Sequence, residues 1–133
     1  MKNALSLFVV TLLGIYTSAT AQTTYTLDNQ TNCDIEIWVE CRNNCRVIGG
    51  LGWDVAANHT IMLDDCVGST SNIFTVNWVD PNCQVAPIFI ENGACLNLPS
   101  TDFLQVACGG CTTGGAGSTA TVTVVGNTLT ITP

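Results

Sequence analysis

The sequence predicts an all-β fold, a disulfide-stapled antiparallel β-sandwich of roughly seven to nine short strands. Residues 34–40 alternate between apolar and mainly polar side chains, which is the period of a half-buried strand. Turn residues recur at short intervals between such segments, as they do in two-sheet sandwiches. Finally, the chain of 133 residues contains eight cysteines, and an even number in an exported protein indicates disulfides.

The first 21 residues have the form of a signal peptide. Lys2 provides a basic start, residues 4–16 are mostly apolar, and Ala19-Thr20-Ala21 has the small-x-small form of a signal-peptidase site. The apolar stretch is shorter than the about 20 residues that a membrane-spanning helix needs. We therefore expect residues 22–133 to form a single β-sandwich domain that is secreted or held at the cell surface, with no membrane span.

The expected mature chain is strongly acidic. The full sequence has a formal net charge of -7, with 10 acidic and 3 basic residues. Lys2 leaves with the signal peptide, so Arg42 and Arg46 are the only lysine or arginine side chains that remain. Binding to phosphate backbones or anionic membranes needs a basic surface. The composition therefore excludes nucleic acid as a partner.

Residues 33–48 predict the central hairpin. The apolar side chains share one face of its first strand, and the polar side chains share the other face with Trp38. A three-residue loop over residues 42–44 would close the hairpin. The cross-strand pairs would then be Cys41 with Cys45, Glu40 with Arg46, Val39 with Val47, and Trp38 with Ile48.

All eight cysteines follow the predicted cleavage site. Cys33 and Cys41 bracket one strand, and an extended strand of that length separates them by far more than the ~7 Å that two bonded cysteine Cα atoms tolerate. They must therefore have different partners. The bonds that we predict first are Cys41–Cys45, across the hairpin, and Cys108–Cys111, across a short glycine spacer. The complete set is Cys33, Cys41, Cys45, Cys66, Cys83, Cys95, Cys108 and Cys111.

Further strands are expected where short apolar or alternating segments lie between turn residues. In one of them Phe74, Val76 and Trp78 share a face, which predicts that this face is buried. Residues 49–52 and 108–118 are rich in glycine and are expected to interrupt regular structure. The expected strands are residues 24–29, 60–63, 73–79, 87–91 as an edge strand that begins with proline, and 103–107.

The end of the chain predicts a second hairpin. Residues 120–125 and 128–132 flank Gly126-Asn127, and glycine at the first turn position suits a two-residue type II′ turn. Val124 should then face Leu129, and Val122 should face Ile131. The other face carries a regular set of threonines that resembles an ice-binding surface. Two strands make a small array, however, and threonine is also typical of the solvent side of an amphipathic strand. These threonines are Thr121, Thr123, Thr130 and Thr132.

Three short segments near the start of the predicted domain form a recognisable series. They are Thr24-Tyr25-Thr26-Leu27-Asp28-Asn29, then Asn32-Cys33, then Ile35-Glu36-Ile37-Trp38. This series resembles the opening of thaumatin-like proteins, and Ile73-Phe74 followed by Cys83 is similar to their second half-sheet. The resemblance covers about residues 24–83. It implies a β-sandwich, and in that family it also implies glucan binding in an acidic cleft, for which this sequence has no recognisable set of residues.

Few residues here suit catalysis. His59 is the only histidine, and it lies at a strand entrance where an exposed, inactive side chain is the ordinary case. No serine lies in a Gly-x-Ser-x-Gly elbow. A cysteine nucleophile would need an unpaired thiol beside the histidine, which the expected disulfides do not leave. We therefore predict no enzymatic activity and no cofactor.

Two kinds of metal site can be weighed against the sequence. Cys41-x3-Cys45 and Cys108-x2-Cys111 have spacings found in zinc sites, but an oxidising compartment favours disulfides. Calcium would need oxygen ligands outside the D-x-[DN]-x-[DN]-G loop, which is absent from the sequence. The calcium candidates are Asp64, Asp65, Asp80 and Asn82. We predict that no metal is bound.

Trp38 is the most suggestive candidate for ligand binding. It shares the polar face of its strand with Glu36 and Glu40, where a sugar ring could stack on the indole while the carboxylates accept hydroxyl hydrogen bonds. A loop such as residues 49–53 could instead cover the indole. Trp53 is a further ligand-binding candidate.

Together these observations predict a secreted, non-enzymatic β-sandwich module for extracellular recognition, adhesion or surface structure. A polysaccharide or an extracellular protein is the expected partner, and self-assembly is an open alternative. Two further alternatives are a carbohydrate-binding protein of the thaumatin-like kind, using Trp38, Glu36 and Glu40, and a secreted inhibitor or defence protein that presents residues 42–44.

Overall fold

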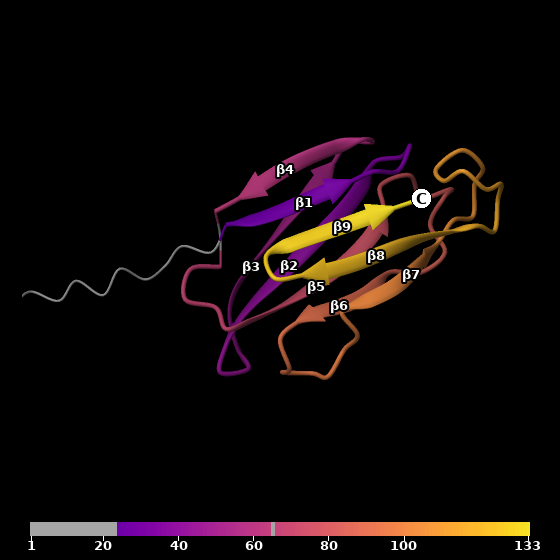
Figure 1. Ribbon diagram of the computed structural model, residues 1–133. Coiled ribbons are helices and arrows are strands. Elements are labelled where there is room, and N and C mark those ends of the chain that lie inside the picture. Colours follow the sequence, from indigo (N-terminus) through magenta and orange to yellow (C-terminus); the bar gives the residue numbers. More distant parts are fainter. Residues whose placement is uncertain (1–23, 65) are drawn as a thin grey trace, which may run out of the picture.

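The computed structural model describes residues 24–64 and 66–133, and these residues form two β-sheets and no helix. The all-β prediction is therefore confirmed, with nine strands in the described chain (Figure 1). The predicted signal peptide lies outside the described residues. The strands are β1 (Tyr25–Asn29), β2 (Ile35–Asn43), β3 (Arg46–Val55), β4 (His59–Leu63), β5 (Ser71–Trp78), β6 (Ile88–Asn92), β7 (Thr101–Gln105), β8 (Thr119–Val125) and β9 (Thr128–Thr132).

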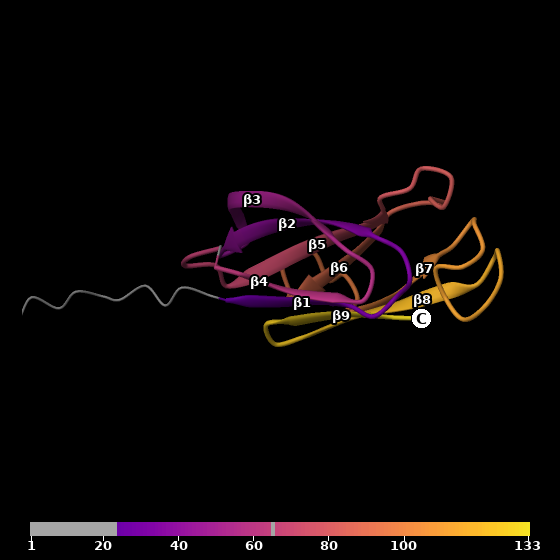
Figure 2. The same ribbon diagram turned by 90° about the horizontal axis from the view of Figure 1, so that it is seen from above.

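The strands are divided between a five-stranded and a four-stranded sheet. The first has the order β4-β1-β9-β8-β7 and the second the order β3-β2-β5-β6. Neighbouring strands are antiparallel except β1 and β9, which are parallel. Figure 2 shows the two layers, with β2, β3 and β5 on one side and β1, β8 and β9 on the other. No helix in the described part of the chain is long and apolar enough to cross a membrane.

The core lies between the two sheets. Alternation along β2 buries Ile35, Ile37 and Val39, as predicted, and leaves Glu36 and Trp38 exposed. The predicted inner face of β5 is also confirmed, because its aromatic and valine side chains are fully buried. The indole Nε1 of Trp78 donates to the carbonyl oxygen of Gln105 at 2.9 Å, which satisfies its polar atom inside the packing.

The hairpin between β2 and β3 is confirmed, but its predicted register is wrong. Asn44 and Cys45 both have positive φ angles, 47° and 63°, which closes a two-residue turn with Asn43 opposite Arg46. A bulge beside Cys41 and Arg42 then shifts the remaining pairs. They are Cys41 with Gly49, Glu40 with Gly50, Val39 with Leu51, and Trp38 with Gly52.

The prediction that residues 49–52 interrupt regular structure is also wrong. β3 continues through these residues as an edge strand of its sheet, paired to β2 along its length. Local preference disfavours glycine in a strand, but the tertiary pairing overrides it. The small residues leave room for the indole of Trp38, which packs against this part of β3.

The C-terminal hairpin is confirmed in both position and register. Val122 pairs with Ile131 and Val124 with Leu129. Gly126 has a φ of 55°, as the first turn position of a type II′ turn requires. The other predicted strands are present with boundaries shifted by a few residues, and the strand that follows Pro87 is an edge strand, as expected.

Both specific disulfide predictions are wrong, although all eight cysteines are paired. Cys41 points into the core while Cys45 lies in the exposed turn, so the two thiols diverge. Cys108 and Cys111 lie with their sulfurs 3.5 Å apart, yet each bonds a cysteine from another loop. The observed bonds are Cys33–Cys111, Cys41–Cys66, Cys45–Cys95 and Cys83–Cys108.

Candidate functional site

An aromatic pair marks the outer face of the four-stranded sheet. Trp38 on β2 pairs with Thr75 on β5, and Thr75 pairs with Phe89 on β6, so these side chains form one row across the sheet. Trp38 is 52% exposed and Phe89 is 48% exposed. Adjacent strands lie about 4.8 Å apart, which places the two aromatic residues on either side of a threonine at roughly twice that spacing.

The indole of Trp38 packs against the glycines of β3. A Cβ atom added at Gly52 would lie 2.6 Å from Cε3 of Trp38, and one added at Gly50 would lie 3.4 Å from its Nε1. The indole therefore rests where any side chain on these two residues would lie. The expectation that residues 49–53 cover Trp38 is wrong, since they form the surface beneath the indole and leave it half exposed.

A groove with a volume of about 320 Å³ runs from Trp38 across β5 and β6. Its lining is mainly apolar, with Thr75 and one ion pair as its polar groups. Small-ligand sites commonly combine such an apolar lining with a few polar groups that orient the ligand. The lining residues are Trp38, Glu40, Arg42, Ile73, Thr75, Phe89, Leu96 and Leu98.

The ion pair joins Glu40 and Arg42 at one end of the groove. Nε of Arg42 donates to Oε1 of Glu40 at 2.6 Å, and Nη1 donates to the carbonyl oxygen of Cys45 at 3.2 Å. These bonds hold the guanidinium between Glu40 and the β2–β3 turn, and both side chains are only partly exposed. The pair places fixed donors and acceptors beside the Trp38 indole.

The segment of residues 93–98 forms the other wall and is anchored by Glu91. This carboxylate is 1% exposed, accepts from Oγ of Ser71 at 2.8 Å, and accepts from the backbone N–H groups of Cys95 at 2.5 Å, Leu96 at 3.0 Å and Leu98 at 3.3 Å. Burial alone would raise the pKa of Glu91, but the hydrogen bonds outweigh it and lower the pKa below its ordinary value. The Cys45–Cys95 bond ties the same segment to the β2–β3 turn.

Only some of the predicted ligand-binding residues come together. Trp38 and Glu40 both line the groove. Glu36 is exposed on the same face, but it is not part of the lining. Trp53 pairs with Ile37 and packs against the core from the inner side of the sheet, so it does not belong to this site.

Sequence reasoning did not identify Phe89, Leu96 or Glu91. Phe89 lies in a short apolar run whose faces cannot be told apart until the pairing with β5 is known. Leu96 lies in an irregular segment with no periodic signal. A signal for Glu91 existed, since an acid within a predicted apolar strand must be exposed or hydrogen-bonded.

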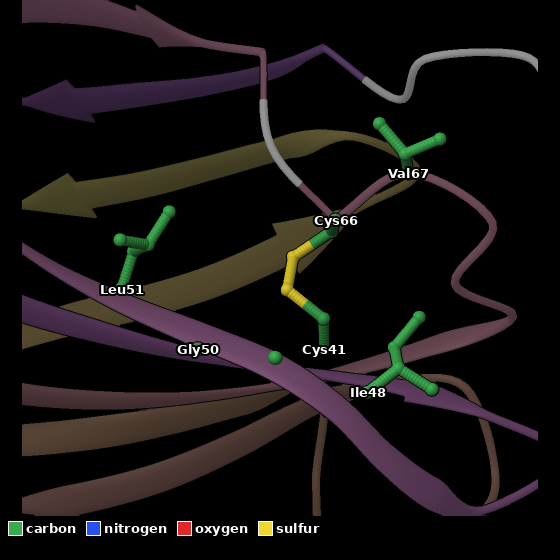
Figure 3. A pocket seen from close by; sticks show the side chains of 7 residues that line it. Cys41, Ile48, Gly50, Leu51, Cys66 and Val67 are labelled. Atoms are coloured by element: carbon green, nitrogen blue, oxygen red, sulfur yellow. A yellow bond between two sulfur atoms is a disulfide. The ribbon is translucent and has the colours of Figure 1, made fainter.

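Two further cavities lie outside this groove. One, of about 260 Å³, opens at the β3 edge over the Cys41–Cys66 bond, with Ile48, Leu51 and Val67 around it (Figure 3). Its described lining contains no charged side chain. The other, of about 220 Å³, lies between residues 85–88 and β7. Neither combines an aromatic surface with fixed polar groups in the way that the groove does.

The other residues considered for catalysis or metal binding do not contribute to the groove. Nδ1 of His59 lies 2.8 Å from the carbonyl oxygen of Ala57. Among the described residues, the one group of three or more ligating side chains within reach of an ion is Cys33, Cys83 and Cys111, and all of their sulfurs are in disulfides. Asp64 and Asp80 belong to no such group, and Asp65 lies outside the described residues.

Comparisons with protein-family models, curated protein sequences and solved structures found no match to this chain. The resemblance to thaumatin-like proteins therefore remains a prediction.

Proposed function

We propose that the protein is a secreted, non-enzymatic recognition module that binds a polysaccharide along the groove beside Trp38. The observation that carries this proposal is the half-exposed indole, which is supported from below by Gly50 and Gly52 and flanked by a fixed ion pair. A tryptophan gains little from such exposure unless a ligand packs on it.

The groove has the two kinds of contact that a sugar chain needs. The C–H face of a sugar ring is apolar and can stack on Trp38, with a second ring reaching Phe89 across Thr75. The ring hydroxyls can bond to Glu40, Arg42 and the Thr75 hydroxyl. The ligand would therefore lie across the strands, from β2 towards β6.

A binding role fits these acids better than a catalytic one. Oε1 of Glu40 accepts from Nε of Arg42 and is also paired with its Nη2, so this oxygen is engaged within the protein. Glu91, which anchors the segment of residues 93–98, already accepts hydrogen bonds from Ser71 and from backbone N–H groups. Secretion is supported by four disulfides, which persist in oxidising compartments.

The test is a pull-down of the secreted, disulfide-bonded protein on cellulose, chitin and insoluble glucans, with Trp38→Ala and Phe103→Ala alongside. Phe103 is a matched control, because it is an equally exposed aromatic residue on the other sheet. We expect at least one matrix to retain the wild type and Phe103→Ala, with roughly tenfold weaker binding of Trp38→Ala, about 1.4 kcal/mol. If no matrix retains the wild type, or if Trp38→Ala binds equally well, the proposal fails.

The apolar lining favours one other candidate, a partner protein that inserts apolar side chains. Ile73, Leu96 and Leu98 would receive such side chains. Peptides selected from a random library on the wild type should then lose binding to Trp38→Ala. The inhibitor alternative has less support, because Arg42 folds back onto Glu40 instead of projecting from the turn.

A further inference from the structure

Threonine dominates the outer face of the five-stranded sheet, on the opposite side of the molecule from the groove. Outward positions alternate with the buried Leu27, Leu129, Ile131, Val122 and Val124, so they are identified by the strand period. The array extends well beyond the C-terminal hairpin, onto β1, β4 and β7. The outward threonines are Thr26, Thr60, Thr101, Thr119, Thr121, Thr123, Thr128, Thr130 and Thr132.

The strand register aligns these side chains in rows across the sheet. The central row is Thr60, Asp28, Thr130, Thr123 and Thr101. One neighbouring row is Met62, Thr26, Thr128 and Val125, and the other is Thr132, Thr121 and Phe103. Exposed apolar side chains therefore lie at the ends of these two rows. Neighbouring side chains within a row lie about 4.8 Å apart, which is the distance between adjacent strands. Neighbouring rows lie about 6.7 Å apart, which is two residues along a strand.

The grid is flattest in the middle of the sheet. Each strand is rotated by roughly 20° from the next, so outer strands turn away from a common plane. The strands β1, β9 and β8 lie side by side at the centre (Figure 1). Their outward positions are Thr26, Thr119, Thr121, Thr123, Thr128, Thr130 and Thr132, together with Asp28 and Val125.

Threonine presents a methyl group and a hydroxyl on a stiff side chain. Its branched Cβ restricts χ1, so the hydroxyl positions are held with little conformational freedom. Thr121, Thr123, Thr130 and Thr132 are each half-buried by their neighbours, which restricts them further. Each hydroxyl can both donate and accept a hydrogen bond. The face therefore presents methyl and hydroxyl groups in a regular arrangement, and both groups can contact ordered water.

Charge is almost absent from this face in a strongly acidic chain. Asp28 is the one carboxylate among the outward positions of β1, β4, β7, β8 and β9. It accepts from Oγ1 of Thr60 at 2.7 Å and from Nε2 of Gln30 at 2.6 Å. Both arginines lie on the other sheet. A nearly uncharged face lacks the complementary charges that would attract a charged macromolecule.

We propose that this face, centred on Thr130, adsorbs to the surface of ice. Its hydroxyl and methyl groups would take the place of ordered water at the crystal surface, and the adsorbed protein would block further growth there. The central strands carry no aromatic side chain on this face, which separates it from the sugar-stacking surface around Trp38. The proposal is independent of the proposed polysaccharide binding.

The test measures thermal hysteresis and partitioning into a slowly growing ice front for the secreted, disulfide-bonded protein. The variants are Thr130→Arg, which lifts the ice away from the face, and Thr130→Val, which keeps the shape but removes one hydroxyl. Thr113→Arg, at an exposed loop position, is the control for added bulk and charge. Trp38→Ala is the control for the groove.

We expect hysteresis and ice partitioning from the wild type, Thr113→Arg and Trp38→Ala, with loss in Thr130→Arg and a partial loss in Thr130→Val. Absence of both signals in the wild type overturns the proposal. Full activity in a folded Thr130→Arg overturns it as well, and so does an equal loss in Thr113→Arg. If Thr130→Arg does not fold, Thr130→Val decides, and unchanged activity in that variant counts against the proposal.

Discussion

The environment of Trp38 depends on residues that contribute no side chain. Gly52 and Gly50 lie beside it on β3, and their Cα atoms leave the space in which the indole rests. An indole in that position has one side covered by backbone and the other half free. The exposed aromatic surface is therefore a property of three residues on two strands.

Substitution of Gly52 should disturb this arrangement without touching Trp38 itself. A methyl group at Gly52 would lie 2.6 Å from Cε3 of Trp38, so the indole must move. Gly49→Ala is the matched control, because no atom lies within 4 Å of a Cβ added there and the backbone φ is not positive. We expect Gly52→Ala to change the tryptophan fluorescence and to weaken polysaccharide binding, while Gly49→Ala leaves both unchanged. Equal behaviour of the two variants would contradict the role given to Gly52.

At the scale of elements, the wall over residues 93–98 has no regular structure and is held by one buried side chain. Glu91 belongs to β6 but is covered by the segment that follows it, whose backbone N–H groups point at the carboxylate. The carboxylate thereby accepts from backbone N–H groups that have no partner in a strand or helix. The position of Leu96 and Leu98 in the groove therefore depends on Glu91.

Glu91→Gln should destabilise the protein by about 2 kcal/mol, because an amide replaces a carboxylate that accepts several buried hydrogen bonds. Glu36→Gln, on an exposed residue, should change stability by less than about 0.5 kcal/mol. Urea unfolding followed by circular dichroism measures both.

The pH dependence of the same contact has a defined sign. The folded-state pKa of Glu91 lies below its ordinary value of 4.5, so the ionised carboxylate stabilises the fold fully above that value. The contribution is lost as pH falls through the lowered folded-state pKa. The difference in stability between wild type and Glu91→Gln should therefore shrink as the pH is lowered below about 4.5. A difference that stays constant down to pH 2 would rule out this source of stability.

In the molecule as a whole, disulfides join neighbouring loops at both ends of the sandwich. Cys45–Cys95 links the β2–β3 turn to the groove wall, whereas Cys83–Cys108 links two loops at the other end. Figure 1 shows these two groups of loops at different ends of the strands. Each bond restricts the unfolded chain and so stabilises the fold.

Removal of either disulfide should lower the stability of the protein, but only removal of Cys45–Cys95 should also weaken polysaccharide binding. Each paired Cys→Ser double variant should lose stability, by about 3 to 4 kcal/mol. We expect the Cys45→Ser, Cys95→Ser variant also to bind polysaccharide more weakly at a temperature where it is folded. The Cys83→Ser, Cys108→Ser variant should keep wild-type retention under the same conditions. Equal binding by the two variants would show that the groove wall does not need its disulfide.

The features that could be predicted from the amino-acid sequence are those that depend on residues close together along the chain. Alternation places Ile35, Ile37 and Val39 on one face of a strand, and Gly126-Asn127 determines both the turn and the register of the last hairpin. The all-β class follows from many such local signals. These features are predictable because each requires only the geometry of one strand or one turn.

The disulfide pairing, the course of β3 and the set of residues that line the groove could not be predicted from the sequence, because they depend on how distant segments pack. Cys41 bonds Cys66, and the turn at Asn44-Cys45 with its bulge sets the pairing of Trp38 with Gly52. The groove brings β2 together with β5, β6 and residues 96–98. The extension of the threonine array from one hairpin to five strands likewise required the order of the sheet. These features depend on contacts between residues far apart in sequence, whose energies local propensity does not contain.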